Sequence, residues 1–301
     1  MKTPVAFIIF NRPDTTARVF ESIRQAKPSK LLVVADGARQ GKVGEAEKCA
    51  VTRAIIDGVD WECEVLTNYS DVNLGCGKRV SSGLNWVFQQ VEEAIILEDD
   101  CLPDSTFFQY CEELLIKYKN HEKVMHIGGY NPTPKSNNQE SLTFSRLVPI
   151  WGWATWQRAW NHYDFKMDLW VEYEKKNDLQ YFKSQQYNVA KTMERFYQGK
   201  FDSWDGQWAF ACLVMNGISI IPNINLIQNI GFRSDATHTT KENIKLGLLS
   251  STLRFPLIEP DSMIPDRLFD EKYLIVLNGD HRKFKLARRI FNYCKSQIYK
   301  K

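Results

Sequence analysis

Several features that mark other protein classes are missing from this sequence. No run approaches the roughly 18 apolar residues of a membrane span, and the apolar stretch at residues 4–10 is too short for a signal sequence. The seven cysteines form no C-x-x-C pair and are too few for a disulfide framework in 301 residues. The net charge of +3 is too small to indicate nucleic acid binding. We therefore expect a cytoplasmic protein with reduced thiols that binds no nucleic acid.

The common glycine-rich nucleotide motifs are also absent. Neither G-x-G-x-x-G nor G-x-x-x-x-G-K-[ST] occurs in the chain, which disfavours a dinucleotide oxidoreductase and a P-loop kinase. The composition is that of an ordinary globular protein, with 44% hydrophobic and 25% charged residues. The chain is thus long enough to bury a full core in one large domain or two modest ones.

Strand-like and helix-like patterns alternate over about the first 130 residues. Helical spacing of apolar residues follows Asp14 and Gly77, and another helix is predicted from Pro103. Buried or half-buried strands are predicted at residues 5–10, 31–35, 61–66, 94–97 and 124–127. This alternation predicts an α/β fold with a mainly parallel, twisted sheet flanked by crossover helices.

The strand predicted at residues 94–97 ends in three consecutive acids, Glu98-Asp99-Asp100. The carboxyl ends of strands in an open α/β sheet face the crevice in which ligands bind. Because crowded carboxylates repel, the usual relief is a divalent cation with hard oxygen ligands, Mg²⁺ or Mn²⁺. The alternative is a solvated loop that caps the next helix, but a cap needs only one acid. The triplet therefore predicts a metal–phosphate site.

Other polar residues follow the neighbouring strands and converge on the same predicted edge. Asn11 and Arg12 follow the first strand, where Arg12 is placed to pair with a phosphate or ribose, and Asp36 follows the second, where it can accept from a uracil imide. A glycine-rich turn before Lys78 and Arg79 resembles a phosphate cradle at a helix N-terminus. The alternatives are a simple Asp-Gly turn and a solvated arginine.

The second half of the chain is rich in tryptophan. Seven of the nine tryptophans lie between residues 151 and 208. Their faces can stack on sugar rings or fill a core. Gly152 lets a backbone approach closely, which favours a ligand wall. We expect Trp151, Trp153 and Trp204 to contact an acceptor, with core packing as the alternative.

Asp205 lies between two tryptophans, where desolvation would raise the pKa of a general base. The alternative is an Asp that caps the following helix. Asp202 and Asp235 are further candidates for the base. His238 ends a glycine- and hydroxyl-rich loop that is suited to closing over a ligand.

Over roughly residues 3–240, this set of residues resembles the GT-A fold of nucleotide-sugar-dependent glycosyltransferases, most closely the N-acetylglucosaminyltransferase I type and its bacterial relatives. The resemblance implies that Asp100 ligates manganese and that Glu98 and Asp99 contact the sugar and ribose. It also implies that Asp205 is the catalytic base.

The same resemblance assigns Arg12 and Asp36 to the nucleotide and His238 to the diphosphate. It implies a metal-dependent, inverting hexosyl- or N-acetylhexosaminyltransferase that uses a UDP-sugar and acts on a cell-surface glycan or its lipid-linked precursor. Residues 1–132 would bind the nucleotide-sugar, and residues 133–260 would bind the acceptor and carry out catalysis. The alternatives are a carbohydrate-binding module without catalysis and a sugar nucleotidyltransferase, although the latter would want a glycine-rich basic loop directly after the first strand.

Residues 261–301 are predicted to form a basic C-terminal extension. No acid follows Asp280, whereas eight lysines and arginines do. Apolar residues recur at steps of three and four, at Phe284, Ala287, Phe291, Cys294 and Ile298. This pattern is typical of an interfacial helix that binds anionic lipid. Peripheral contact with the inner face of a membrane is therefore a hypothesis, and packing of the helix on its own domain is the alternative.

Overall fold

The computed structural model describes residues 1–134, 139–176, 178–182, 186–231 and 248–277. The elements of the first half, in chain order, are β1 (Val5–Ile9), α1 (Pro13–Ala26), β2 (Lys30–Ala35), α2 (Glu45–Ala54), a 3₁₀ turn (Ile55–Gly58), β3 (Glu64–Tyr69), α3 (Cys76–Gln90), β4 (Glu93–Glu98), β5 (Cys101–Pro103), α4 (Thr106–Tyr118) and β6 (Val124–Gly128). The elements of the second half are β7 (Leu142–Ser145), β8 (Trp153–Trp156), α5 (Gln157–Trp160), α6 (Trp170–Lys175), a 3₁₀ turn (Asp178–Phe182), α7 (Gln186–Tyr197), α8 (Asp205–Val214), β9 (Ile218–Pro222), β10 (Ile227–Asn229) and α9 (Arg267–Leu277).

Eight of these strands form one sheet in the order β3-β2-β1-β4-β8-β6-β9-β7. The pairs β2–β3, β1–β2, β1–β4 and β6–β9 are parallel, whereas β8 runs antiparallel to both β4 and β6. The predicted α/β class is therefore confirmed. β8 follows residue 132 but pairs with β4 and β6, which both precede it, so one sheet spans the predicted boundary at residue 132.

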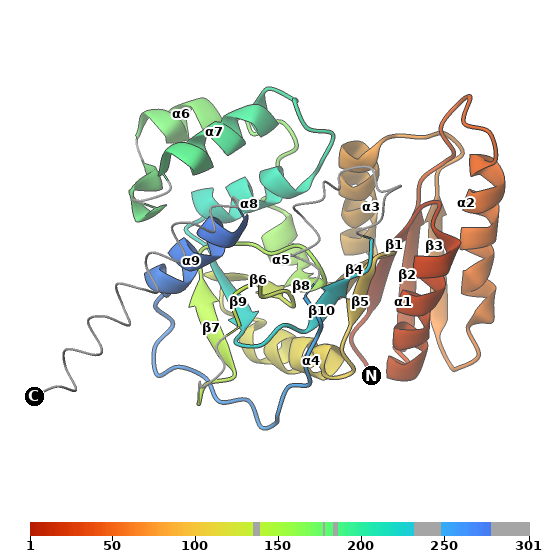
Figure 1. The fold of residues 1–301 in the computed structure, drawn as a ribbon, viewed down its shortest axis with the longest axis horizontal. Helices are drawn as coiled ribbons and strands as arrows, with labels where there is room; N and C mark the ends of the chain where they lie inside the picture. The colour runs from red at the N-terminus through yellow and green to blue at the C-terminus, as the bar shows by residue number, and fades with distance from the viewer. Residues whose placement is uncertain (135–138, 177, 183–185, 232–247, 278–301) are drawn as a thin grey trace, which may run out of the picture.

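Helices cover both faces of the sheet (Figure 1). Side chains of β1 alternate between two cores: Val5, Phe7 and Ile9 pack with α1 and α4, whereas Ala6 and Ile8 pack with α3, α5 and α8. A third, smaller core forms where α6 and α7 lie over α8. Burial on both faces explains the continuous apolar runs of β1, β2 and β4.

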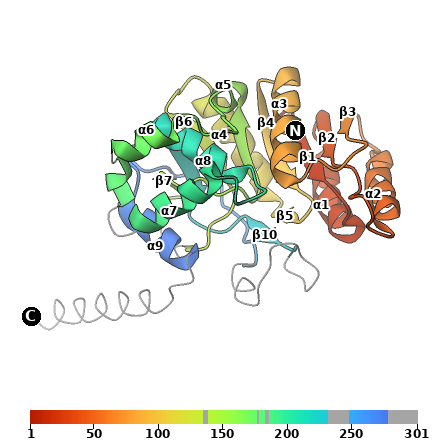
Figure 2. The same ribbon diagram turned by 90° about the horizontal axis from the view of Figure 1, so that it is seen from above.

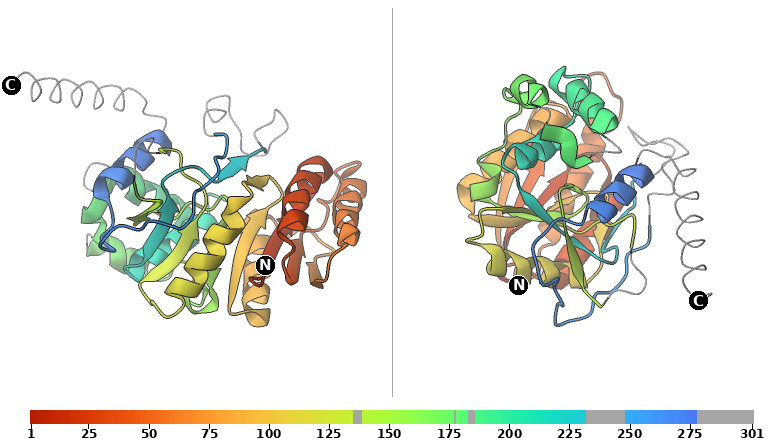
Figure 3. Two further views of the ribbon diagram at one scale, coloured as in Figure 1. Left: turned by 90° about the horizontal axis from the view of Figure 1, so that it is seen from below. Right: turned by 90° about the vertical axis from the view of Figure 1, so that its left-hand side faces the viewer.

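Different helices lie at the two ends of the molecule. Seen from above, α1 and α2 lie at one end and α6, α7 and α9 at the other (Figure 2). The further views show the same arrangement, with the red N-terminal elements far from the green helices (Figure 3). The strand ends that carry the predicted site lie between these two groups.

The five predicted strands are observed as β1, β2, β3, β4 and β6. The helix α2 was not predicted, and the helix predicted from Pro103 begins at Thr106. β3 begins at Glu64 and not at residue 61. Trp61 lies before the strand because its ring packs 6.0 Å from that of Phe20. Its Nε1 also donates to the Pro28 carbonyl at 2.8 Å. These two contacts fix Trp61 in the loop before β3, so its apolar side chain does not indicate a strand.

Within the described residues, no helix is long and apolar enough to cross a bilayer. Part of the predicted C-terminal extension belongs to the fold, because Phe269 and Tyr273 of α9 are buried in the main core. The basic periodic segment that motivates the membrane hypothesis begins after Leu277 and lies outside the described residues.

Candidate functional site

The acidic triplet lies at the carboxyl end of β4, beside the end of β1. Phe10 N donates to Asp99 Oδ2 at 3.1 Å, and Arg12 Nη1 lies 2.7 Å from Asp100 Oδ2 and 3.4 Å from Asp99 Oδ1. The pairing of Ile8 with Glu98 in the β1–β4 register brings these residues together. The first and fourth strands of the chain thus place one guanidinium against the triplet.

One arginine does not balance three carboxylates. Burial raises the pKa of Glu98 well above its usual range, and Asp100, Asp99 and Asp205 add to the shift by repulsion. Burial and Asp100 also raise the pKa of Asp99, to about 7. Glu98 Oε1 is buried and has no hydrogen-bond partner among the described residues. The site therefore favours the binding of positive charge.

This donor set fits a hard divalent cation. The described part of the chain holds no cluster of three or more His, Cys, Asp or Glu side chains arranged as a complete metal site. Mg²⁺ commonly binds through one or two carboxylates together with substrate phosphates and water, and such a site needs no protein cage. Asp100 and the unpartnered oxygen of Glu98 supply oxygen ligands of that kind.

The segment after β10 closes one side of the triplet. Ile230 N donates to the Asp100 carbonyl at 2.8 Å. A Cβ at Gly231 would overlap the Asp100 carboxylate, so only glycine fits there without a shift. His238 lies outside the described residues.

Asn11 belongs to a network that the sequence did not reveal. Its Nδ2 donates to Glu45 Oε1 at 2.9 Å, and Arg39 Nη2 lies 2.5 Å from the same oxygen. The hydrogen bond from Arg39 lowers the pKa of Glu45 to about 2, against the effect of burial. Asn11 therefore holds α2 against the β1 loop. No local pattern marks Glu45, because its partners come from other segments.

Asp36 has a structural role that differs from the expected contact with a uracil. Its carboxylate accepts from the backbone amides of Gly37, Leu74 and Gly75 and from Asn73 Nδ2, at 2.9–3.1 Å. Both oxygens are thus occupied by the loop that leads into α3. The expectation of a free acceptor at Asp36 was wrong, because a buried carboxylate recruits the nearest amides.

The predicted phosphate cradle before α3 is also occupied from within the chain. Asp202 Oδ2 accepts from Cys76 N at 3.1 Å, and its Oδ1 accepts from Gly77 N at 2.9 Å. Buried Arg79 donates to the carbonyl of Asn68 at 2.7 Å, so it does not face a phosphate. Lys78 is exposed. The helix N-terminus does bind an anion, as its dipole favours, but the anion is a side chain.

Most of the tryptophans between residues 151 and 208 pack in the hydrophobic core. Trp153 and Trp204 are only 0% and 1% exposed, and their rings stack 5.5 Å apart. Trp153 also stacks on buried His126 at 5.2 Å. The close approach at Gly152 comes from Ile227, since a Cβ there would overlap that side chain. The expected acceptor contacts of Trp153 and Trp204 are therefore corrected to core packing.

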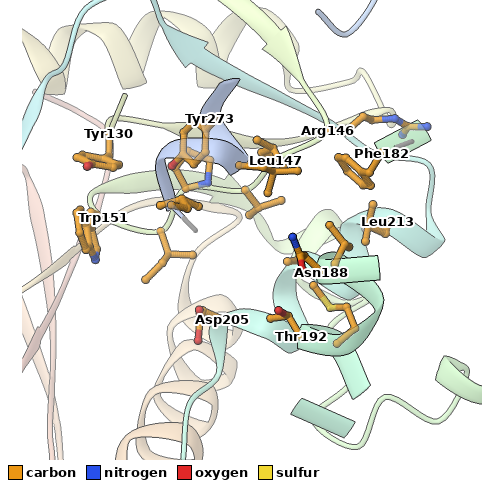
Figure 4. A pocket seen from close by; sticks show the side chains of 18 residues that line it. Tyr130, Arg146, Leu147, Trp151, Phe182, Asn188, Thr192, Asp205, Leu213 and Tyr273 are labelled. Atoms are coloured by element: carbon orange, nitrogen blue, oxygen red, sulfur yellow. The ribbon is translucent and has the colours of Figure 1, made fainter. Parts of the chain in front are cut away.

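Trp151 and Asp205 border a pocket of about 350 Å³ between α7, α8, α9 and the segment before β8 (Figure 4). Trp151 lies edge-on to Tyr130, with ring centroids 4.5 Å apart. Asp205 is the first residue of α8 and accepts a hydrogen bond from Ser203 Oγ. No side chain in the described structure caps α8 by a hydrogen bond, so Asp205 is not its cap.

Asp205 also lies near the acidic triplet, because repulsion from its charge contributes to the raised pKa of Glu98. It therefore lies between the pocket and the carboxyl end of β4. One carboxylate borders both the cation-binding edge and the apolar pocket. This is the arrangement in which a base could serve a molecule that enters from the pocket side.

No protein-family model matches the chain, and no curated protein matches its sequence. Among solved structures, it resembles S. aureus TarS 1–349 at 10% identity and a TM-score of 0.41, over 75% of this chain and 59% of that one. UDP-glucose pyrophosphorylase complexed with UDP-glucose matches at 10% identity and a TM-score of 0.39, over 76% of this chain and 94% of that one. Mouse xyloside xylosyltransferase 1 matches at 10% identity and 0.35, over 70% and 81%. Because these TM-scores lie below 0.5, the functional conclusion below is drawn from the residues of the site.

Proposed function

We propose that this protein is a metal-dependent, inverting glycosyltransferase that moves a sugar from a UDP-sugar to a hydroxyl of a glycan acceptor. One observation carries the proposal. Asp205 at the start of α8 lies near Glu98 of the under-neutralised acidic triplet at the end of β4, and it also lines a pocket. A donor that enters at the triplet and an acceptor that enters at the pocket would meet at Asp205.

The residues of the site have separate roles in the proposed reaction. Mg²⁺ or Mn²⁺ held by Asp100 would offset the charge that develops on the departing diphosphate. Arg12, already 2.7 Å from Asp100, orients that carboxylate and adds positive charge beside it. Asp205 accepts the proton of the attacking hydroxyl, and its hydrogen bond from Ser203 fixes the carboxylate. Attack from the face opposite the diphosphate inverts the configuration.

The alternative functions fit the structure less well. A sugar nucleotidyltransferase needs a basic, glycine-rich loop after β1, but α1 begins at Pro13 and the preceding Arg12 is held by the triplet. A carbohydrate-binding module needs accessible aromatic faces, whereas six of the seven clustered tryptophans are buried. Only Trp151 of that cluster borders the pocket.

Calorimetric titration with UDP tests the proposal. We expect UDP to bind with low micromolar to millimolar affinity in Mn²⁺ and much more weakly in a chelator, and Asp100→Ala to remove this difference. Asp104→Asn is the matched control, because Asp104 is a nearby acid that accepts from Thr106 N at 2.9 Å, at the start of α4. Equal UDP affinity with and without Mn²⁺ in the unaltered protein would rule out the proposed metal site.

A further inference from the structure

The pocket beside Asp205 is markedly apolar. Ten of its eighteen lining residues are aliphatic and four are aromatic. Of the four other residues, Arg146 already donates to the Gly217 carbonyl at 2.8 Å. Asp205 and Trp151 lie at one end of the pocket, and Phe182 and Arg146 lie at the other (Figure 4).

This lining does not suit a free sugar. A buried pyranose needs a hydrogen-bond partner for each hydroxyl, and a hydroxyl left without one loses its bonds to water. Beyond Asp205, the walls offer mainly the side chains of leucine, valine, isoleucine, proline and methionine. An aliphatic group, by contrast, gains free energy from every methylene that it buries there.

Size and position narrow the occupant further. A volume of about 350 Å³ is at the lower end of the range for ligand pockets, roughly 300–1,000 Å³. It accommodates a short chain or one ring and not an oligosaccharide. Because Asp205 borders the pocket at one end and lies near Glu98 of the triplet, the group inside would be attached to the reacting sugar.

We infer that the acceptor carries an apolar aglycone, an alkyl or isoprenoid chain, that fills this pocket while its sugar hydroxyl lies at Asp205. The inference rests on the proposed function and defines the acceptor class for that same site. The substrates would then be the first sugars attached to a lipid or alkyl chain, and not the distant end of a long soluble glycan.

The test compares octyl β-D-glucoside with methyl β-D-glucoside, two probes that differ only in the aglycone. Their binding is measured by calorimetry, with the protein's tryptophan fluorescence as a second signal, below the concentration at which octyl glucoside forms micelles. We expect octyl glucoside to bind at least about tenfold more tightly, because two buried methylenes are enough for that ratio.

Two variants test whether the preference for the octyl chain arises in the pocket. Thr192→Phe adds a ring at an exposed lining position of α7, and Ala209→Leu narrows the pocket from α8. Both should reduce the preference for the octyl chain several-fold. Lys191→Phe, which adds the same ring at an exposed position of α7 that does not line the pocket, should retain it. Thermal unfolding of each variant checks that the fold is intact.

The outcomes separate this inference from the proposed function. Equal affinity for the two glucosides, or an equal effect of Thr192→Phe and Lys191→Phe, overturns the inference, while Mn²⁺-dependent UDP binding and UDP release from a donor would still stand. An octyl preference that Thr192→Phe removes supports the apolar pocket even if no UDP-sugar is consumed. In that case the proposed transfer reaction fails instead.

Discussion

Substitution of Asp205 by Asn separates catalysis from binding. Asn has nearly the same shape as Asp but does not accept a proton. Asp205 makes no hydrogen bond that caps α8, and its partner Ser203 Oγ can donate equally well to an amide oxygen. The fold, the neighbouring tryptophan core and the triplet should therefore be unchanged.

A general base typically increases the reaction rate by a factor of roughly 10²–10⁴. We expect the release of UDP from a UDP-sugar, with water in place of the acceptor, to fall by a factor in that range in Asp205→Asn. The affinity for UDP in Mn²⁺ should change less than about twofold, because the substitution does not touch Asp100 or Arg12.

The assay follows UDP release in a coupled reaction and UDP affinity by calorimetry on the same preparations. Ser203→Ala is the companion variant. It removes the hydrogen bond that orients Asp205 but leaves the base, so it should reduce the rate by less than Asp205→Asn. An unchanged rate in Asp205→Asn would refute the assigned role. The next candidate would then be Asp235, which lies outside the described residues, because the Asp202 carboxylate already caps α3.

Three further predictions address the surroundings of the site. Asp202→Ala removes the carboxylate that caps α3, so the free energy of unfolding should fall by about 1 kcal/mol and the rate of UDP release should fall as well. Asp202→Asn should retain most of the stability and most of the rate. Denaturant titration measures the stability, and the coupled assay measures the rate. Gly231→Ala should weaken Mn²⁺-dependent UDP binding roughly tenfold or more, because its Cβ displaces the Asp100 carboxylate, whereas Gly58→Ala, which meets only ordinary contacts, should not. Burial raises the pKa of Asp270 to about 6, so its stabilisation is present near pH 4 and is lost as the pH rises through 6. Urea unfolding should show the stability of the wild type relative to Asp270→Asn falling by about 3 kcal/mol over that range, and a difference independent of pH would contradict this.

The sequence was sufficient to predict the α/β class and the strands of the first half, because buried strands such as β1 and β4 are continuous apolar runs between turn residues. It was also sufficient to place Arg12 near the triplet, since the ends of parallel strands meet at one edge. It did not predict the antiparallel strand β8 within the sheet. Trp61 shows where the pattern fails. Its apolar ring suggested a strand, but its contacts with Phe20 and the Pro28 carbonyl fix it in the preceding loop.

The roles of polar side chains were harder to predict, because they depend on partners that are distant in the chain. Asp36 has the sequence context of a ligand-binding acid, but the loop around Leu74 occupies its carboxylate. Asp202 caps α3 across more than a hundred residues. The tryptophans show a similar ambiguity, since Trp151 borders the pocket while Trp153, two residues later on a strand, is fully buried.

Phosphorus NMR of the protein mixed with Mg²⁺ and a panel of UDP-sugars distinguishes the proposed transferase from a nucleotidyltransferase. A parallel sample contains UTP and the matching sugar 1-phosphates. We expect UDP to appear from at least one UDP-sugar, Asp100→Ala and Asp205→Asn to reduce it greatly, and the UTP sample to stay unchanged. Formation of pyrophosphate and a UDP-sugar in the second sample, with no UDP released in the first, would contradict the account and identify a nucleotidyltransferase instead.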